Sequence, residues 1–174
     1  PEDSIEIIFH DSPAICTFDV ISIILKNSKI SKYDLKEILV DEYLHYYTEY
    51  KFEIIQILKL QGKRKIAEQL ILKKSTLSDI IMNDNYYATN MDIWLLVKHF
   101  KLPVVFLSST ELIENNKKFL VANSLGLDTE YYYFIRTPGI KVDVPSVYRL
   151  VASQEHKDKI PLSSLNSDFS KSIK

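Results

Sequence analysis

The stretch HDSPAICTFDVISIIL, residues 10–25, contains the only cysteine of the chain, Cys16. An Asp-Ser-Pro turn, residues 11–13, comes directly before it. The segment from Phe18 to Leu25 is apolar on nearly every face at helical spacing, which predicts a buried helix that begins near Cys16. A cysteine at a helix start suits a nucleophile, because this position lowers the pKa of a thiol. A free cysteine is also a common small core residue, so both interpretations of Cys16 are open.

The composition is typical of one globular domain. The chain has 174 residues, of which 46% are hydrophobic and 26% charged, with a net charge of −1 and a pI near 6.5. This balance predicts neither a nucleic-acid partner nor a membrane-surface partner. The basic cluster Lys63-Arg64-Lys65 is interpreted as one solvated helix face.

The single cysteine predicts a reducing compartment, and the short apolar runs predict no membrane-spanning helix. One cysteine cannot form an internal disulfide, and no apolar run reaches the roughly 18 residues that a membrane-spanning helix needs. The chain starts at Pro1 with no signal-peptide pattern, so we expect a cytoplasmic piece of a larger parent protein. Abundant Ile, Lys, Asn and Tyr are typical of an AT-biased microbe or a large DNA virus, so that cytoplasm would be that of a host or a virus-infected cell.

Nucleotide and zinc sites are not expected. The three glycines, Gly62, Gly126 and Gly139, cannot supply a P-loop or a dinucleotide fingerprint. The histidines are dispersed and have no zinc-ligand spacing with the single cysteine. The sequence therefore predicts no cofactor and no metal ion. The four histidines are His10, His45, His99 and His156.

Capping signals mark the starts of several expected helices. Ser31 with Asp34, and Thr89 with Asp92, form the Ser/Thr-x-x-acid pattern of a capping box, and capping alone explains Asp92. A further short helix, 75–83, is capped by Ser75 or Thr76. The other expected helices cover 52–60, 64–74 and 89–100, and the helix after Ser31 buries a stripe of Leu35, Ile38, Leu39, Tyr43 and Tyr46.

Strands are expected at the start of the chain and through its second half. The segments 117–124 and 129–137 flank a turn with Gly126, which predicts a hairpin. Residues 153–174 are Ser/Lys-rich with little periodicity and are interpreted as a loosely attached tail. One domain over residues 1–152 is therefore expected, of the α+β class, with a helical N-terminal half packed on a small, mostly antiparallel sheet. The remaining expected strands are 5–10, 103–109 and 146–152.

Two segments together resemble the ovarian-tumour (OTU) family of cysteine proteases. CTFDVISIIL, residues 16–25, is similar to the family pattern Asp-Gly-x-Cys-Leu/Thr-Phe-Arg-x-Leu around its nucleophile. NDNYYATNMDIWLLVKHFKLPVVFLSS, residues 83–109, is similar to a second family segment. The resemblance covers about residues 8–137 and implies an OTU-like, papain-type cysteine protease fold, a deubiquitinase family and a link to ubiquitin or a ubiquitin-like modifier. The residues that match the second segment are Tyr87, Ala88, Asp92, Ile93, Leu95 or Leu96, Pro103, Val104 and Val105.

The resemblance implies Cys16 as the nucleophile, activated by a histidine from a late strand. Tyr131 occupies the place where that histidine is expected. Tyrosine, with an ordinary pKa of roughly 10, is a poor base at neutral pH. His10 and His156 are the other candidate bases. The residues before Cys16, Pro13-Ala14-Ile15, also lack the family's Asp-Gly.

These departures predict an OTU-like domain with a degenerate catalytic site. Such a pseudoenzyme would act as a binding or structural module for ubiquitin or a ubiquitin-like protein within its parent protein. One alternative is an active OTU-type cysteine isopeptidase that uses Cys16. Another alternative is an α+β scaffold or assembly domain with no ubiquitin link. None of the three involves nucleic acid or a membrane.

Overall fold

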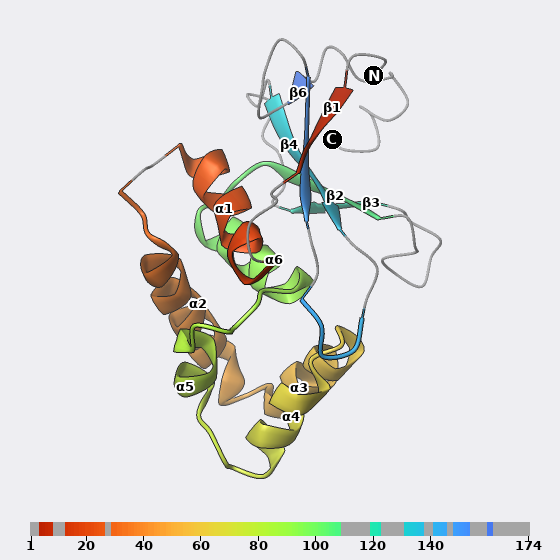
Figure 1. The fold of residues 1–174 in the computed structure, drawn as a ribbon. Coiled ribbons are helices and arrows are strands. Elements are labelled where there is room, and N and C mark those ends of the chain that lie inside the picture. Colours follow the sequence, from red (N-terminus) through yellow and green to blue (C-terminus); the bar gives the residue numbers. More distant parts are fainter. Residues whose placement is uncertain are drawn as a thin grey trace. The chain divides into compact units, whose positions relative to one another are not determined.

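The computed structural model describes residues 4–8, 13–26, 29–108, 119–122, 131–137, 141–145, 148–153 and 160–161 (Figure 1). The chain divides into two compact units. The helical unit comprises Asp11–Leu96 and Ile140–Ser146. The sheet unit comprises Pro1–His10, Val97–Gly139 and Val147–Lys174.

In the described part of the helical unit there are five helices and most of a sixth. The sixth, α6, crosses the boundary, since Leu96 belongs to the helical unit and Val97 to the sheet unit. The helices expected from sequence are therefore present, with boundaries shifted by a few residues. They are α1 (Pro13–Leu25), α2 (Lys32–Tyr47), α3 (Lys51–Leu60), α4 (Arg64–Ile71), α5 (Leu77–Met82) and α6 (Asn90–His99).

The first helix begins earlier than the cysteine. Pro13 opens α1, a position that suits proline because the first helical residues need no N–H donor. Cys16 is the fourth residue of α1, in its first turn, and Pro13 to Ile15 are helical rather than a loop. Phe18 and Ile21 are buried as expected, whereas Ile23 is partly exposed.

Capping boxes start α2 and α5. At α2, the Ser31 hydroxyl accepts from the Asp34 N–H, and the Asp34 carboxylate accepts from the Ser31 N–H. The same reciprocal pair joins Thr76 and Asp79 at α5, which settles that Thr76, and not Ser75, is the cap. Each box satisfies backbone donors that the first helical turn leaves free.

The buried stripe of α2 is shorter than the spacing predicted. Leu35, Leu39 and Tyr43 are buried, but Ile38 is only half-buried and Tyr46 is exposed. Tyr46 lies in the last turn of α2, where its ring packs edge-on against the neighbouring His45 ring instead of entering the core. Helical spacing alone does not show where the neighbouring elements end.

The described residues of the sheet unit include six strands, and their pairing is mostly antiparallel, as expected. The order along the sheet is β1-β5-β4-β2-β3, with β6 paired to β4. Only the β2–β4 pair is parallel among the described strands. The strands are β1 (Ser4–Ile8), β2 (Val104–Ser108), β3 (Phe119–Ala122), β4 (Tyr131–Thr137), β5 (Arg149–Ser153) and β6 (Ile160–Pro161).

The hairpin expected between β3 and β4 is wrong. Both strands pair with β2 instead, β3 antiparallel and β4 parallel. Val104, Val105 and Phe106 of β2 are all buried, as is typical of a central strand covered on both faces. Such a strand accepts a partner on each edge, so β2 separates the two segments.

The segment expected as a tail contributes to the sheet. Ser153 ends β5, and Ile160 and Pro161 pair with Tyr132 and Tyr131 of β4. The rest of the segment lies outside the described residues.

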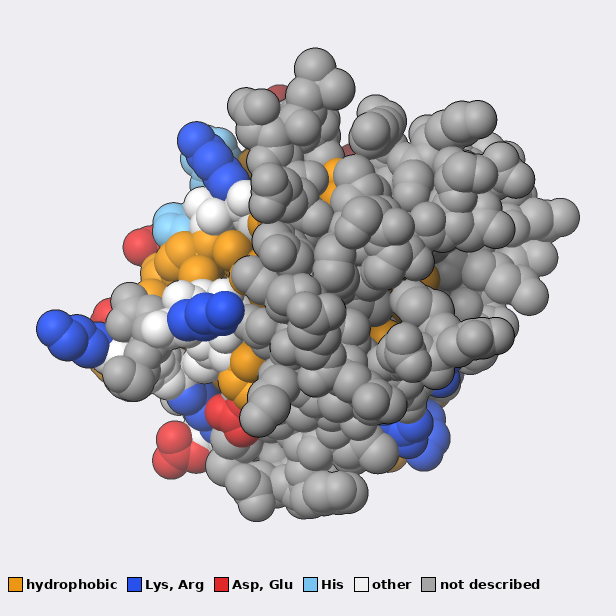
Figure 2. Space-filling model, turned by 90° about the horizontal axis from the view of Figure 1, so that it is seen from above, with side chains coloured by type: hydrophobic (Ala, Val, Ile, Leu, Met, Phe, Trp, Pro, Cys, Tyr) orange, Lys and Arg blue, Asp and Glu red, His pale blue; other side chains and the backbone are white. Residues whose placement is uncertain are grey.

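Several large apolar side chains remain at the surface. Hydrophobic side chains gather in one area of the face drawn in Figure 2, beside acidic, basic and histidine side chains. The most exposed apolar side chains are Phe52, Leu60, Leu72 and Tyr33.

No helix in the described part of the chain is long and apolar enough to cross a membrane.

Candidate functional site

The candidate catalytic residues fall on different units. Cys16 is in the first turn of α1 in the helical unit, and Tyr131 is the first residue of β4 in the sheet unit. Their side chains, and all of His10 and His156, lie outside what the structure describes. The structure therefore gives Cys16 its helix position and Tyr131 its strand position, and the distances among the four candidates lie outside what it describes.

The β4 strand carries tyrosines rather than a histidine. Its sequence is YYYFIRT, and Tyr132 is buried with a pKa raised by that burial. Tyr133 is half-buried, and its backbone N–H donates to the Pro103 carbonyl at 2.9 Å. Tyr132 therefore belongs to the core, and Tyr133 is partly covered on its strand.

The two histidines on described helices are exposed. His45 lies in the last turn of α2 and His99 in the last turn of α6. Each ring packs edge-on against the aromatic ring of the next residue, Tyr46 or Phe100.

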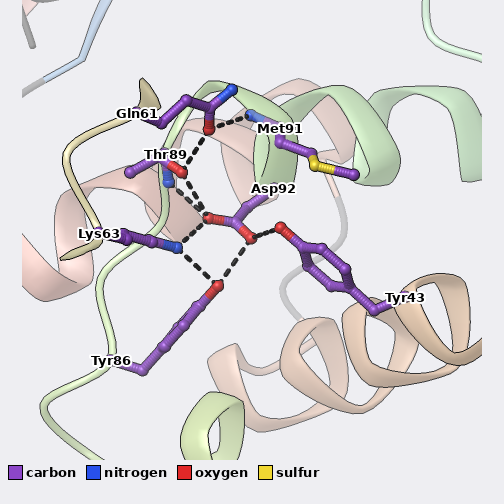
Figure 3. Close-up of polar contacts among 7 residues, drawn as sticks. All are labelled: Tyr43, Gln61, Lys63, Tyr86, Thr89, Met91 and Asp92. Atoms are coloured by element: carbon purple, nitrogen blue, oxygen red, sulfur yellow. Dashed lines mark hydrogen bonds and ion pairs between the residues drawn. The ribbon is translucent and has the colours of Figure 1, made fainter. Parts of the chain in front are cut away.

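A buried carboxylate, Asp92, is the centre of the polar network in Figure 3. Its Oδ2 accepts from the Lys63 ammonium and from the Thr89 backbone N–H, both at 2.6 Å. Its Oδ1 accepts from the hydroxyls of Tyr43 and Tyr86, both at 2.7 Å. The capping role expected of Asp92 is thus confirmed at Thr89, but it is only part of what this carboxylate does.

Lys63 is the cation of the network, and its interpretation as a solvated side chain is wrong. The side chains of Lys63 and Asp92 are both 0% exposed, and they form an ion pair. Lys63 also donates to the Tyr86 hydroxyl at 2.7 Å, and its ammonium lies 4.1 Å from the centroid of the Tyr86 ring. Burial lowers the pKa of Lys63, and the charge of Asp92 opposes this effect.

The turn after α3 explains why Lys63 points inward. Gly62 has a φ of 85° and donates its N–H to the Lys59 carbonyl, while the Lys63 N–H donates to the Leu58 carbonyl. This is a Schellman motif, in which the residue after the glycine usually makes an inward contact. Gly62 was therefore the sequence signal that Lys63 lies in a turn and not on a helix face.

Gln61 completes the network at the start of α6. Its Oε1 accepts from the Thr89 hydroxyl at 2.7 Å and from the Met91 N–H at 3.1 Å. Gln61 and Asp92 together bind the backbone donors that the first turn of α6 leaves free. The fully buried ion pair joins the α3–α4 turn to α6, and the Tyr43 hydroxyl connects α2 to the same carboxylate.

An open pocket of about 430 Å³ is lined in part by Tyr86 and Tyr87. Its apolar lining includes Ile66 of α4 and Ile80 of α5. Tyr87 is half-buried there, and its pKa is raised, first by burial and then by the negative charges of Asp143 and Asp92. The polar lining includes Lys65, Gln69, Asp79, Asn83 and Asp143.

The architecture matches a known fold. A solved structure described as "Structure of Ovarian Tumor (OTU) domain in complex with Ubiquitin" matches the chain with a TM-score of 0.55. The match covers 98% of this chain and 84% of that chain at 15% sequence identity. The chain has an OTU-like fold. The α+β, OTU-like expectation from sequence is therefore confirmed, and at this identity the likeness concerns the fold alone.

Sequence comparisons add nothing to this result. No protein-family model matches the chain, and no curated protein matches it. The OTU-like fold therefore rests on the structural match.

Proposed function

We propose that this chain is an OTU-like domain that binds ubiquitin or a ubiquitin-like modifier as a catalytically impaired module of a larger protein. One domain, extended past residue 152 to include the β6 pairing at Ile160–Pro161, would carry this function. The observation that supports it is the OTU-like fold, matched over 98% of the chain to a domain solved with ubiquitin. Ubiquitin is the partner of that domain, and its transfer to this chain is our proposal.

The proposed impairment follows from what surrounds a nucleophilic cysteine. A thiol is mostly protonated at neutral pH and needs a neighbouring base to become a thiolate. Tyr131 stands where the family pattern expects this base, and tyrosine cannot accept a proton at neutral pH without a large pKa shift. Without a base, substrate binding can persist while peptide-bond cleavage is lost.

An active cysteine isopeptidase is the second candidate, and the position of Cys16 favours it. Cys16 lies in the first turn of α1, where the partial positive charge of the helix N-terminus stabilises a thiolate. In this case His10 or His156 would replace the missing strand histidine as the base.

A ubiquitin probe with an electrophilic C-terminus tests catalysis directly. We expect no covalent labelling of the wild-type chain at neutral pH. Labelling that disappears in Cys16→Ala would overturn the impairment, and its loss in His10→Ala or His156→Ala would identify the base.

Restoring the histidine gives a gain-of-function test with a matched control. We expect Tyr131→His to gain probe labelling that Cys16→Ala abolishes, because an imidazole then stands at the family position. Tyr133→His, two residues along the same strand, should gain none. Equal labelling of both variants would contradict the assignment of Tyr131 to the base position.

Binding is tested separately from catalysis. We expect titration of isotope-labelled ubiquitin, and of related modifiers, with the Cys16→Ala chain to give saturable changes in NMR chemical shift for at least one modifier. The absence of binding to all of them would favour a scaffold domain with no ubiquitin link.

A further inference from the structure

An apolar and basic surface lies where the α3–α4 turn meets the segment between β4 and β5 (Figure 1). The Asp143 N–H donates to the Gly62 carbonyl at 2.7 Å, and the Asp143 Oδ1 accepts from the Lys65 N–H at 3.0 Å. These hydrogen bonds hold residues 141–145 against residues 59–65. We call these two stretches together the turn patch.

Three apolar side chains of the turn patch are exposed. Leu60 is 73% exposed, and Val142 and Val144, on either side of Asp143, are 48% and 47% exposed. None of the three lines the pocket beside Tyr87. Because they protrude into solvent, they suit a partner that they can enter, and covering them with an apolar phase is favourable.

The turn patch is positively charged. It contains four cations outside the buried network and one carboxylate, Asp143, which gives a net charge of +3. Lys63 is not counted, because its charge is neutralised by the ion pair with Asp92. The net charge of −1 for the whole chain therefore conceals a local basic surface, and the expectation of no membrane-surface partner does not extend to it. The four cations are Lys59, Arg64, Lys65 and Lys141.

The backbone of the turn patch is ordered before any partner arrives. Gly62 and Asp143 hold left-handed turns, with φ of 85° and 52°, and the Lys63 N–H donates to the Leu58 carbonyl at 2.9 Å. Such preorganisation reduces the entropy lost on binding. The exposure of Leu60 thus belongs to a hydrogen-bonded turn.

We propose that the turn patch binds the surface of a membrane that contains anionic phospholipids. Protruding apolar side chains enter the boundary between headgroups and acyl chains, while neighbouring lysines and arginines attract the anionic headgroups. An acidic protein could also attract the cations, but it would need a preformed pocket for each protruding side chain, which a bilayer does not. This surface lies outside the proposed ubiquitin function, and its test requires no ubiquitin.

Vesicle sedimentation with the full chain tests the proposal. The probes are vesicles of phosphatidylcholine alone and vesicles that also contain phosphatidylserine. We expect the chain to pellet with the mixed vesicles and to stay in solution with phosphatidylcholine alone, because only the mixed vesicles offer negative charge to the turn patch. Added salt should release the bound chain, since it screens this attraction.

Variants with matched controls locate the surface. Leu60→Ser should weaken binding to the mixed vesicles about tenfold, because it removes an inserted apolar side chain. Leu72→Ser changes an exposed leucine outside the turn patch and should have little effect. Arg64→Gln should weaken binding about fivefold, whereas Lys74→Gln, outside the turn patch, should change it little.

Any of four results would overturn the proposal. Three are equal pelleting with both kinds of vesicle, equal losses in Leu60→Ser and Leu72→Ser, and no pelleting at all. The fourth is retention on a polyglutamate resin without pelleting, which would assign the turn patch to an acidic protein. Thermal unfolding of each variant, compared with the wild type, separates a loss of fold from a loss of the surface.

Discussion

The starts of α5 and α6 use the same sequence pattern at different depths. At α5, Thr76 and Asp79 are exposed and bond only within the first turn. At α6, Asp92 also accepts from Thr89 three residues before it, but it is fully buried and adds Lys63 and two tyrosines as donors. One capping pattern therefore serves a helix end in one place and a tertiary junction in the other.

The difference follows from the cost of burying a charge. The exposed Asp79 carboxylate is solvated, and its pKa is lowered by hydrogen bonds from the Thr76 side chain and backbone. A carboxylate in the core loses this solvation and is stable there only with a cation and enough donors around it. Burial thus makes the stability of α6 depend on residues far away in the sequence, such as Lys63 and Tyr43.

Removing the cation should have the largest effect. We expect Lys63→Met to lower the free energy of unfolding by about 3–5 kcal/mol, because Asp92 is left as a buried charge without its counterion. Urea denaturation followed by circular dichroism measures this loss. Arg64→Met, which changes the exposed neighbour, should stay within about 0.5 kcal/mol of the wild type.

A double variant keeps this prediction testable if Lys63→Met does not fold. Lys63→Met with Asp92→Asn removes both charges, so it should be more stable than Lys63→Met alone. A double variant less stable than both single variants would show that the ion pair is not the source of the loss.

Removing one neutral donor should have a smaller effect. Tyr43→Phe deletes one of the two hydroxyls on Oδ1 of Asp92 and should cost about 1.5–3 kcal/mol, the range for hydrogen bonds to charged groups. Tyr33→Phe, on the exposed side of the same helix, is the matched control. Equal losses in these two variants would contradict a specific role for the Tyr43 hydroxyl.

Alkaline pH should lower the free energy of unfolding through Tyr86. Burial, followed by the negative charge of Asp92, raises the pKa of Tyr86 well above its ordinary value of 10.0. Above pH 10 the unfolded chain releases this proton while the folded chain keeps it, so stability falls as the pH rises, by about 1.4 kcal/mol per pH unit. The lowered pKa of Lys63 acts in the opposite direction up to pH 10.5.

Urea denaturation between pH 8 and pH 11 separates these contributions. The fall above pH 10 should be steeper for the wild type than for Tyr86→Phe, which has no hydroxyl to titrate. Parallel curves for the two proteins would exclude Tyr86 as the source.

Deleting the exposed cap should have the smallest effect. Thr76→Ala removes a side-chain acceptor at the start of α5 and should cost about 1 kcal/mol. Ser78→Ala, an exposed position inside α5, is the control and should change little. A loss at Thr76 as large as that in Lys63→Met would remove the distinction between the two helix starts.

Local signals predicted the helices well. The capping patterns at Ser31 and Thr89 act within one turn, so they can be read without knowing the tertiary structure. The order of elements predicted the OTU-like fold, because the segments 16–25 and 83–109 each carry a family pattern at the expected separation.

Long-range features could not be predicted in the same way. The burial of Lys63 depends on Tyr86 and Asp92, which are 23 and 29 residues further along the chain. Adjacent strands at 117–124 and 129–137 suggested a hairpin, but strand β2 lies between them. The candidate catalytic site could not be predicted from sequence for a different reason. A cysteine and its base form a site only when their side chains lie within hydrogen-bond distance, and their positions in the sequence do not give that distance.

The strand pairing has a consequence for how the chain folds. β1 and β5 are separated by most of the sequence, and Ile8 is paired with Arg149. During synthesis β1 leaves the ribosome long before its partner exists, because the whole helical unit lies between them in the sequence. We therefore expect the helices to form first and β1 to dock last, in a slow step set by the entropy of closing so long a loop.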